Sequence, residues 1–298
     1  MSTSLVEFKG VGKRYPFFAL EDIDLQIAPG QVIGFIGPNG AGKSTTIRIL
    51  MGLITQDCGA VRVLGRSMPA EQAAAKRDIG FVSEEMRLYG SMTLEWHMRF
   101  VASVVPHWDA RYAAQLMESF NLQPKQQTKG LSHGQRMKAI TLLALARRPR
   151  LLVLDEPMTG LDPVARQEIL TELIDVVTNE ERSVLFSSHS TQDVEQISDH
   201  ITFIDRGRII ESSDKEVFLD RWRRLHAEVP AGKALPQLPG VVDVASSGRI
   251  AVITTKAFSP DLPAFYEQAG ARIREVHHMT LEEIFVAEVM SSRKEKVA

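Results

Sequence analysis

Apolar and polar residues form short alternating segments up to Ser83, and glycine, proline and polar turns separate these segments. Alternation is typical of a strand with one buried face, and a continuous apolar run is typical of a strand buried on both faces. These patterns predict strands at residues 5–8, 23–27, 32–36, 60–64 and 79–82. Helical spacing at 46–51 and 70–76 places helices between strands, which predicts an α/β fold.

The spacing of apolar residues becomes helical between about residues 86 and 149. Thr93 and Ser132 each precede such a run, as helix N-cap residues do, and a further helix is expected at 110–120. Pro149 ends the last of these helices because proline cannot continue one. Strands and helices then alternate again, with strands expected at 151–154, 183–188, 201–204 and 208–210 and helices at 164–178 and 191–198.

The pattern changes once more beyond Trp222, where prolines and glycines interrupt the chain. Strands are expected at 241–244, 250–254 and 272–276, and helices at 262–268 and 281–290. We interpret residues 1–220 as one domain, with its helical part at 86–149, and residues 221–298 as a small α+β domain. The basic group at the junction is expected to be a solvated linker; its members are Arg221, Arg223 and Arg224.

Composition is that of an ordinary globular protein, with 44% hydrophobic and 24% charged residues and a formal net charge of −2. Nothing in this balance indicates a strongly basic surface, so no nucleic-acid partner is expected. The single cysteine, Cys58, permits no internal disulfide. The N-terminus lacks the apolar core of a signal peptide, and no apolar run approaches the roughly 18 residues that a membrane span needs. We therefore expect a cytoplasmic protein whose membrane role, if any, requires a separate partner.

A glycine-rich stretch separates the strand at 32–36 from the helix that follows it. Glycines let successive backbone N–H groups turn toward phosphate oxygens, and the helix N-terminus adds its own N–H groups and dipole. In such a loop Lys43 reaches the β- and γ-phosphates of a nucleotide and Ser44 ligates Mg²⁺. The alternative is a glycine-rich turn that binds nothing. The predicted phosphate-binding loop consists of Gly37, Pro38, Asn39, Gly40, Ala41, Gly42, Lys43, Ser44 and Thr45.

Two carboxylates, Asp155 and Glu156, follow the buried strand at 151–154. Asp155 is placed to hold Mg²⁺, directly or through water, and Glu156 is the candidate general base that activates water for attack on the γ-phosphate. An acidic pair that merely ends a strand is the alternative. The phosphate-binding loop upstream favours the catalytic interpretation.

A second anion site is indicated at Ser132, Gly134 and Gln135, where a hydroxyl and a glycine amide begin a helix. With Leu131 and His133 these residues form the segment Leu-Ser-His-Gly-Gln, which resembles the Leu-Ser-Gly-Gly-Gln signature of the ATP-binding-cassette (ABC) ATPases. The resemblance implies a P-loop NTPase cassette: a RecA-like core with a mixed sheet, an antiparallel β subdomain and a helical subdomain. It also implies a head-to-tail dimer that holds two ATP molecules, each between one P-loop and the signature of the other subunit.

Further residues match the family in order. By this resemblance Tyr15 stacks on adenine, Asp162 belongs to the D-loop at the dimer interface, and His189 contacts the γ-phosphate as a catalytic residue beside Glu156 and Lys43. Glu84 stands where the family has a glutamine that senses Mg²⁺, so the resemblance makes it a candidate metal ligand with Ser44 and Asp155. An ionised carboxylate cannot donate a hydrogen bond as glutamine does, and its effect on coupling stays open. So does the effect of His133 in place of glycine.

Residues 278–285 resemble the C-terminal end of ATPase subunits from bacterial ABC-2 type exporters of drugs, antibiotics and bacteriocins, whose membrane domain is a separate polypeptide. The resemblance implies an ATP hydrolase on the inner face of the cell membrane. Its implied partners are a second copy or a second ABC ATPase, and multi-pass permease subunits. Two alternatives stay open: a soluble nucleotide-gated clamp, and an added regulatory role for the C-terminal domain. ATP and Mg²⁺ are the expected cofactors.

Overall fold

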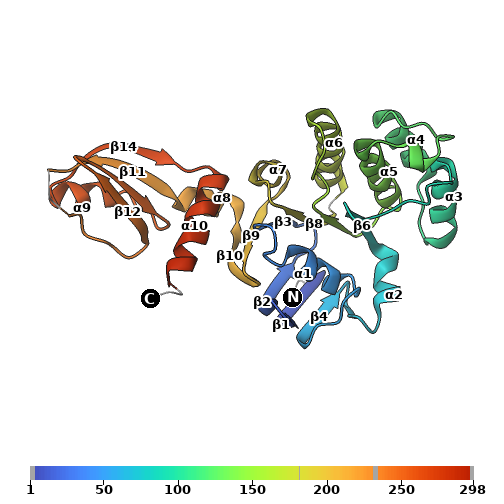
Figure 1. The fold of residues 1–298 in the computed structure, drawn as a ribbon, viewed down its shortest axis with the longest axis horizontal. Helices are drawn as coiled ribbons and strands as arrows, with labels where there is room; N and C mark the ends of the chain where they lie inside the picture. Colours follow the sequence, from blue (N-terminus) through green and yellow to red (C-terminus); the bar gives the residue numbers. More distant parts are fainter. Residues whose placement is uncertain (1–3, 181, 231–233, 296–298) are drawn as a thin grey trace. The chain divides into compact units, whose positions relative to one another are not determined.

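The computed structural model describes residues 4–180, 182–230 and 234–295. The chain separates into two compact units, Met1–Ile209 and Ile210–Ala298 (Figure 1). This division falls before residue 220, where the sequence suggests a boundary. The chain passes from one unit to the other within strand β10 (Arg208–Asp214), which ends the larger sheet.

The larger sheet of the first unit has six strands in the order β10-β9-β3-β8-β7-β6. Strands β3, β6, β7, β8 and β9 are parallel where they pair, and all four inner strands lie in apolar surroundings, as the continuous apolar runs predict. Arg206 and Gly207, both with positive φ, form the two-residue turn between β9 and β10. The strand bounds are β3 (Val32–Ile36), β6 (Ile79–Ser83), β7 (Leu151–Asp155), β8 (Ser183–Ser188) and β9 (His200–Asp205).

A smaller antiparallel sheet has the order β2-β1-β4-β5. Its strands are β1 (Val6–Tyr15), β2 (Phe18–Ile27), β4 (Cys58–Val63) and β5 (Arg66–Ser67). Helix α1 (Lys43–Leu50) lies between the two sheets, and the main core fills the space around it (Figure 1). Because apolar area removed from water contributes about 25 cal/mol per Å², this shared core fixes the helix that begins at Lys43.

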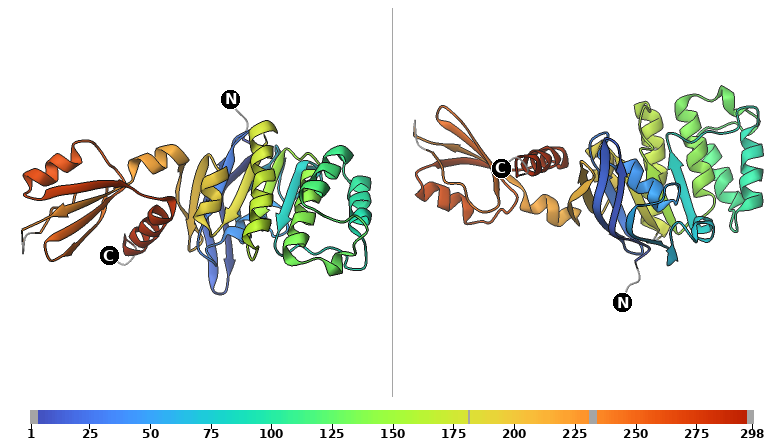
Figure 2. Two further views of the ribbon diagram at one scale, coloured as in Figure 1. Left: turned by 90° about the horizontal axis from the view of Figure 1, so that it is seen from above. Right: turned by 60° about the horizontal axis from the view of Figure 1, so that its bottom comes forward.

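The opposite face of the larger sheet carries α6 (Pro163–Glu180) and α7 (Thr191–Ile197) (Figure 1). A helical part gathers at one end of the unit, in green in Figure 2, after the short α2 (Gln72–Ala75). Thr93 and Asp109 cap two of its helices by accepting hydrogen bonds from Trp96 N at 3.2 Å and Tyr112 N at 2.9 Å. These helices are α3 (Leu94–Val104), α4 (Ala110–Ser119) and α5 (His133–Leu145). Within the described residues, no helix has both the length and the apolar composition that crossing a bilayer requires.

The second unit contains a four-stranded antiparallel sheet in the order β12-β13-β11-β14, with its own apolar core. Its elements are α8 (Lys215–Arg221), β11 (Arg223–Glu228), β12 (Val241–Ser247), β13 (Ile250–Thr255), α9 (Leu262–Gln268), β14 (Arg272–His278) and α10 (Leu281–Glu295). The sequence predicts all of them except α8 and β11.

The solvated linker predicted at the junction is wrong for Arg223. This arginine begins β11 with its side chain buried, and it donates hydrogen bonds to the carbonyls of Leu219 and Trp222 at 3.1 and 2.8 Å. It also pairs with Asp220 at 2.9 Å. A buried guanidinium is tolerated because these acceptors satisfy it. Arg224, by contrast, is about one third exposed and pairs with Glu283.

Candidate functional site

Parallel strand register brings the candidate residues to one edge of the larger sheet. Ile36, which ends β3, pairs with Ser188 of β8, and Asp155 of β7 pairs with Ser187 of β8 and Ser83 of β6. The segments that leave these strands carry the glycine-rich loop, Glu156, His189 and Glu84. The carboxyl edge of a parallel sheet is where ligands of open α/β folds bind.

The glycine-rich loop leads from β3 into α1, and the backbone requires its glycines for two different reasons. A Cβ at Gly37 would lie 2.4 Å from the carbonyl oxygen of Ile204, so the close approach excludes any side chain. Gly40 and Gly42 have φ of +78° and +115°, which L-residues rarely adopt. Gly42 is also the N-cap of α1. The loop therefore turns tightly and ends at the N-terminus of α1, whose first N–H groups can bind an anion.

Lys43 is buried at the base of this loop. Its Nζ donates to the carbonyl oxygens of Gly37 at 2.7 Å and Pro38 at 3.3 Å, and it lies 3.0 Å from Glu156 Oε1. The ammonium therefore joins the loop to the carboxylate at the end of β7.

Asp155 and Ser44 form the pair expected to hold a divalent cation. Ser44 Oγ lies 3.1 Å from Asp155 Oδ1, and Ser187 Oγ donates to the same oxygen at 2.9 Å. Mg²⁺ in nucleotide sites takes oxygen ligands from one or two protein groups and from substrate phosphates. A hydroxyl and a carboxylate beside a phosphate-binding loop fit that ion. Burial raises the pKa of Asp155, and the hydrogen bonds from Ser187 and Ser44 offset only part of this shift.

Glu156 contacts side chains from three other parts of the site, Lys43, Thr159 and His189. Its backbone has φ of +51°, in the left-handed region, and its N–H lies within 3.1 Å of Ser187 Oγ. Oε2 accepts a hydrogen bond from Thr159 Oγ1 at 3.1 Å and lies 2.7 Å from His189 Nδ1. Burial acts to raise the pKa of Glu156, but Lys43 and His189 outweigh it, so that pKa lies below its usual value. The Glu156 carboxyl group is therefore ionised at neutral pH and can accept a proton.

Aromatic side chains flank the loop on the side of the antiparallel sheet. Phe17 and Phe18 line a pocket together with Glu156 and the loop residues Asn39, Gly40, Gly42, Lys43, Ser44 and Thr45. Tyr15 is 41% exposed at the end of β1 and stacks on Phe18 with ring centroids 6.4 Å apart. The sequence singled out Tyr15 and missed Phe17 and Phe18. The two phenylalanines directly after Pro16 were the available signal in the sequence.

Glu84 follows directly after β6, one residue beyond the Ser83 that pairs with Asp155. Its side chain is exposed. The next residue, Glu85, pairs with Arg48 of α1 at 2.5 Å.

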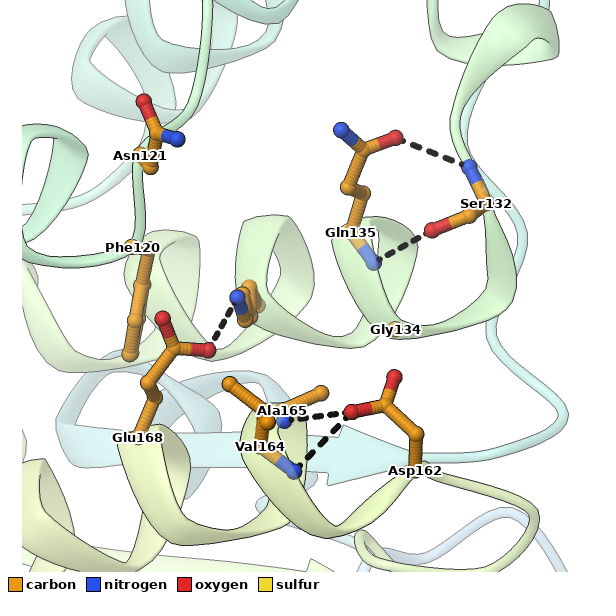
Figure 3. Close-up of a pocket in the computed structure, with 10 residues that line it drawn as sticks. Phe120, Asn121, Ser132, Gly134, Gln135, Asp162, Val164, Ala165 and Glu168 are labelled. Carbon is orange, nitrogen blue, oxygen red and sulfur yellow. Dashed lines mark hydrogen bonds and ion pairs between the residues drawn. The ribbon is translucent and has the colours of Figure 1, made fainter.

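The predicted second anion site lies at the start of α5 (Figure 3). Ser132 Oγ accepts from Gln135 N at 3.2 Å, and Gln135 Oε1 accepts from Ser132 N at 3.0 Å, a reciprocal capping box. A Cβ at Gly134 would lie 3.1 Å from Ala165 Cβ, so α5 begins close against α6. Asp162 caps α6 by accepting from the N–H groups of Val164 and Ala165. Ser132, Gly134, Gln135 and Asp162 line one open pocket.

Comparison with known proteins places this geometry in a family. Residues 20–159 match the ABC transporter family. The chain is 30% identical over 224 residues to "Nod factor export ATP-binding protein I" of Cupriavidus metallidurans, covering 73% of this chain and 74% of the relative. It is 34% identical over 204 residues to "Lantibiotic transport ATP-binding protein SrtF" of Streptococcus pyogenes, covering 68% of this chain and 86% of the relative. It is also 34% identical over 196 residues to "Linearmycin resistance ATP-binding protein LnrL" of Bacillus subtilis, covering 64% and 63%.

Solved structures agree on the fold. A structure described as the ATP-binding subunit of an ABC transporter matches with a TM-score of 0.66 and 27% identity, over 73% of this chain and 92% of that one. A dimeric ATP-binding cassette bound to ADP and phosphate matches with a TM-score of 0.63 and 21% identity, over 70% and 98%. The predicted α/β cassette fold is thereby confirmed. The chain belongs to the ABC transporter family, as an ATP-binding ATPase subunit.

Proposed function

We propose that this chain is the ATPase subunit of an exporter and that it drives separate membrane subunits by closing on ATP and hydrolysing it. The observation that carries the catalytic part is the position of Glu156. Its carboxylate lies within hydrogen-bond distance of Lys43 at the phosphate-binding loop and of His189 at the end of β8. A base and a cation side by side at a helix N-terminus support in-line attack on a phosphate.

Binding of the nucleotide is assigned to the glycine-rich loop, 37–45. Its backbone N–H groups and the N-terminus of α1 would hold the phosphate oxygens, and Lys43 would exchange its present carbonyl contacts for β- and γ-phosphate oxygens. Tyr15 would stack on the adenine ring, as an exposed aromatic at the end of β1 permits. Phe17, fully exposed in the same pocket region as the loop, adds a second apolar surface for the base.

Mg²⁺ would be held by Ser44 and Asp155. When bound, the ion neutralises charge on the β- and γ-phosphates. Ser187 orients Asp155 through its hydrogen bond to Oδ1, and this leaves the carboxylate directed at Ser44. Glu84, which follows the Ser83 that pairs with Asp155, is assigned to the outer part of this site as a further oxygen ligand of the ion or of its bound water.

Glu156 is the proposed general base for the attacking water. Thr159 and His189 hold Oε2, so the carboxylate is oriented before the reaction, which is what positioning contributes to rate. His189 is half-exposed and faces the site, where it can also donate to a γ-phosphate oxygen. Lys43, Glu156 and His189 form the proposed catalytic set.

A second copy, or a second ABC ATPase, would complete the site. Ser132, Gly134 and Gln135 present a hydroxyl, a glycine amide and a helix N-terminus on an open surface, and Asp162 lies beside them (Figure 3). Such a group binds anions. Facing the γ-phosphate held by another cassette, it would make a head-to-tail dimer with two ATP molecules.

Export is supported by two of the relatives, whose names include export or transport of Nod factor and lantibiotic. The test is a pull-down of tagged Glu156→Gln chain from detergent-solubilised native membranes with ATP and Mg²⁺, analysed by mass spectrometry. The control is the same pull-down with the surface substitution Phe265→Ala added to the tagged chain. Recovery of a stoichiometric multi-pass membrane protein in both experiments supports the proposal. Recovery of the chain with ribosomes or DNA and no membrane protein would replace it with a soluble clamp.

A further inference from the structure

His133 stands in the signature segment where the family resemblance implies glycine, and its ring contacts a different loop. Nε2 lies 2.9 Å from the main-chain oxygen of Thr159, and Nδ1 lies 2.9 Å from an Arg136 guanidinium nitrogen. Because a guanidinium only donates, Nδ1 accepts and Nε2–H donates to Thr159. The neutral Nε2–H tautomer satisfies both contacts, so the ring bridges the start of α5 to the turn after β7.

Thr159 continues this connection to the proposed base. Its hydroxyl donates to Glu156 Oε2 at 3.1 Å, and its N–H lies 3.3 Å from the Glu156 carbonyl oxygen. The next residue, Gly160, has φ of +70°, and a Cβ there would lie 3.4 Å from His133 Nε2. The imidazole therefore packs closely along the turn at 156–160 and hydrogen-bonds its backbone.

The turn needs such support because Glu156 itself has left-handed backbone geometry. A non-glycine residue keeps that conformation only where surrounding contacts hold it. Ser187 holds the side that faces the sheet, through its contacts to the Glu156 N–H. His133 holds the opposite end of the turn, at Thr159. The carboxylate is thus positioned from the sheet and from α5 together.

We propose that His133 is a positioning residue for Glu156, acting through Thr159. This inference rests on the proposed function, in which Glu156 is the base. It gives the departure from glycine a role: the first turn of α5, which would meet the nucleotide of a second cassette, is tied to the base of its own site.

The test is steady-state ATP hydrolysis by the full-length chain. We expect His133→Gly to lower kcat about tenfold and to leave KM for ATP within about twofold of wild type. Misplacement of the Glu156 carboxylate slows the chemical step, whereas the phosphate-binding loop that holds the nucleotide is unchanged. The conservative His133→Gln variant extends an amide nitrogen to the distance of Nε2 and should restore kcat to within about twofold. His133→Asn is too short to reach Thr159 and should behave as glycine does. Equal thermal unfolding of the variants checks the fold.

A double-mutant cycle with Thr159→Val locates the effect. If His133 acts through Thr159, the loss in the double variant is smaller than the product of the two single losses. Losses that multiply, or an unchanged kcat in His133→Gly, would overturn the inference, since His133 would then act elsewhere or not at all. Loss of hydrolysis in Glu156→Gln with normal His133→Gly rejects only the role of His133. Wild-type rates in Glu156→Gln reject the proposed base and the inference with it.

Discussion

Replacing Gly34 by alanine tests how tightly the strand that leads into the phosphate-binding loop packs against α7. A Cβ at this position would lie 1.9 Å from Val194 Cγ1 and 3.2 Å from Ser198 Oγ. Ordinary carbon contacts lie at about 3.5–4.0 Å, so one of the two elements must move by roughly 1.5 Å or more. Val194 and Ser198 are both buried. The valine side chain is short and β-branched, so it cannot absorb the shift as the end of a long flexible side chain would.

Overpacking of this kind costs about 1–3 kcal/mol. For a unit of this size each kcal/mol lowers Tm by about 2–4 °C, so we expect Gly34→Ala to lower Tm by roughly 2–12 °C. Thermal unfolding followed by circular dichroism measures this. Gly130→Ala is the matched control, because its nearest neighbour to an added Cβ is 3.9 Å away, and it should leave Tm nearly unchanged.

The double variant Gly34→Ala/Val194→Ala provides the decisive comparison. Val194→Ala alone should destabilise by about 1–2 kcal/mol through lost burial. In the double variant the methyl of residue 34 occupies part of the space that valine leaves, so the two losses should not add. Additive losses, or a Gly34→Ala variant as stable as wild type, would refute the packing argument.

Three further outcomes follow from the site. Tyr15→Ala should raise the Kd for ATP about fivefold or more, as loss of one stacked base does. The control Tyr89→Ala, which changes an exposed tyrosine of the helical part, should leave the Kd unchanged. Calorimetric titration measures both, and a Kd of Tyr15→Ala equal to that of wild type would contradict the stacking role. Asp155→Asn should leave nucleotide binding without Mg²⁺ unchanged and reduce Mg²⁺-dependent hydrolysis at least about a hundredfold, because the amide cannot replace the charged ligand; full Mg²⁺ stimulation would exclude Asp155 as a ligand. The pKa of Glu156 is lowered from its usual 4.5, so its ionised form stabilises the fold above that pH and this contribution is lost as the pH falls through the lowered pKa. Glu156→Gln should therefore be less stable than wild type at pH 7, with a gap in Tm that narrows below pH 4.5; a constant gap would contradict the assigned sign.

The elements that the sequence predicts are those with a strong local signal. Apolar runs at β3, β7 and β8 are buried on both faces, and glycine before Lys43 has no substitute at φ of +115°. An apolar run and a glycine beside Lys43 can both be recognised from residues that are adjacent in the sequence. Strand β11 was missed because it begins with two arginines, although its alternation of buried Leu225 and Ala227 is that of a strand.

The contacts that organise the site could not be predicted in this way. Glu156 meets Lys43, Thr159 and His189 only because parallel strands bring distant segments to one edge. Its positive φ carries no sequence signal, since glutamate rarely adopts it. The bridge from His133 to Thr159 likewise depends on how α5 packs beside the turn after β7, and a motif comparison registers His133 only as a departure.

The most direct measurement of the central claim compares ATP hydrolysis by the wild-type chain and by Glu156→Gln, with ATP binding measured on the same preparations. General-base catalysis contributes about 10²–10⁴-fold, and glutamine keeps the size of the side chain while it loses the proton acceptor. We predict that Glu156→Gln binds ATP at least as tightly as wild type and hydrolyses it at least about a hundredfold more slowly. Hydrolysis at a near wild-type rate by a variant that binds ATP normally would contradict the account.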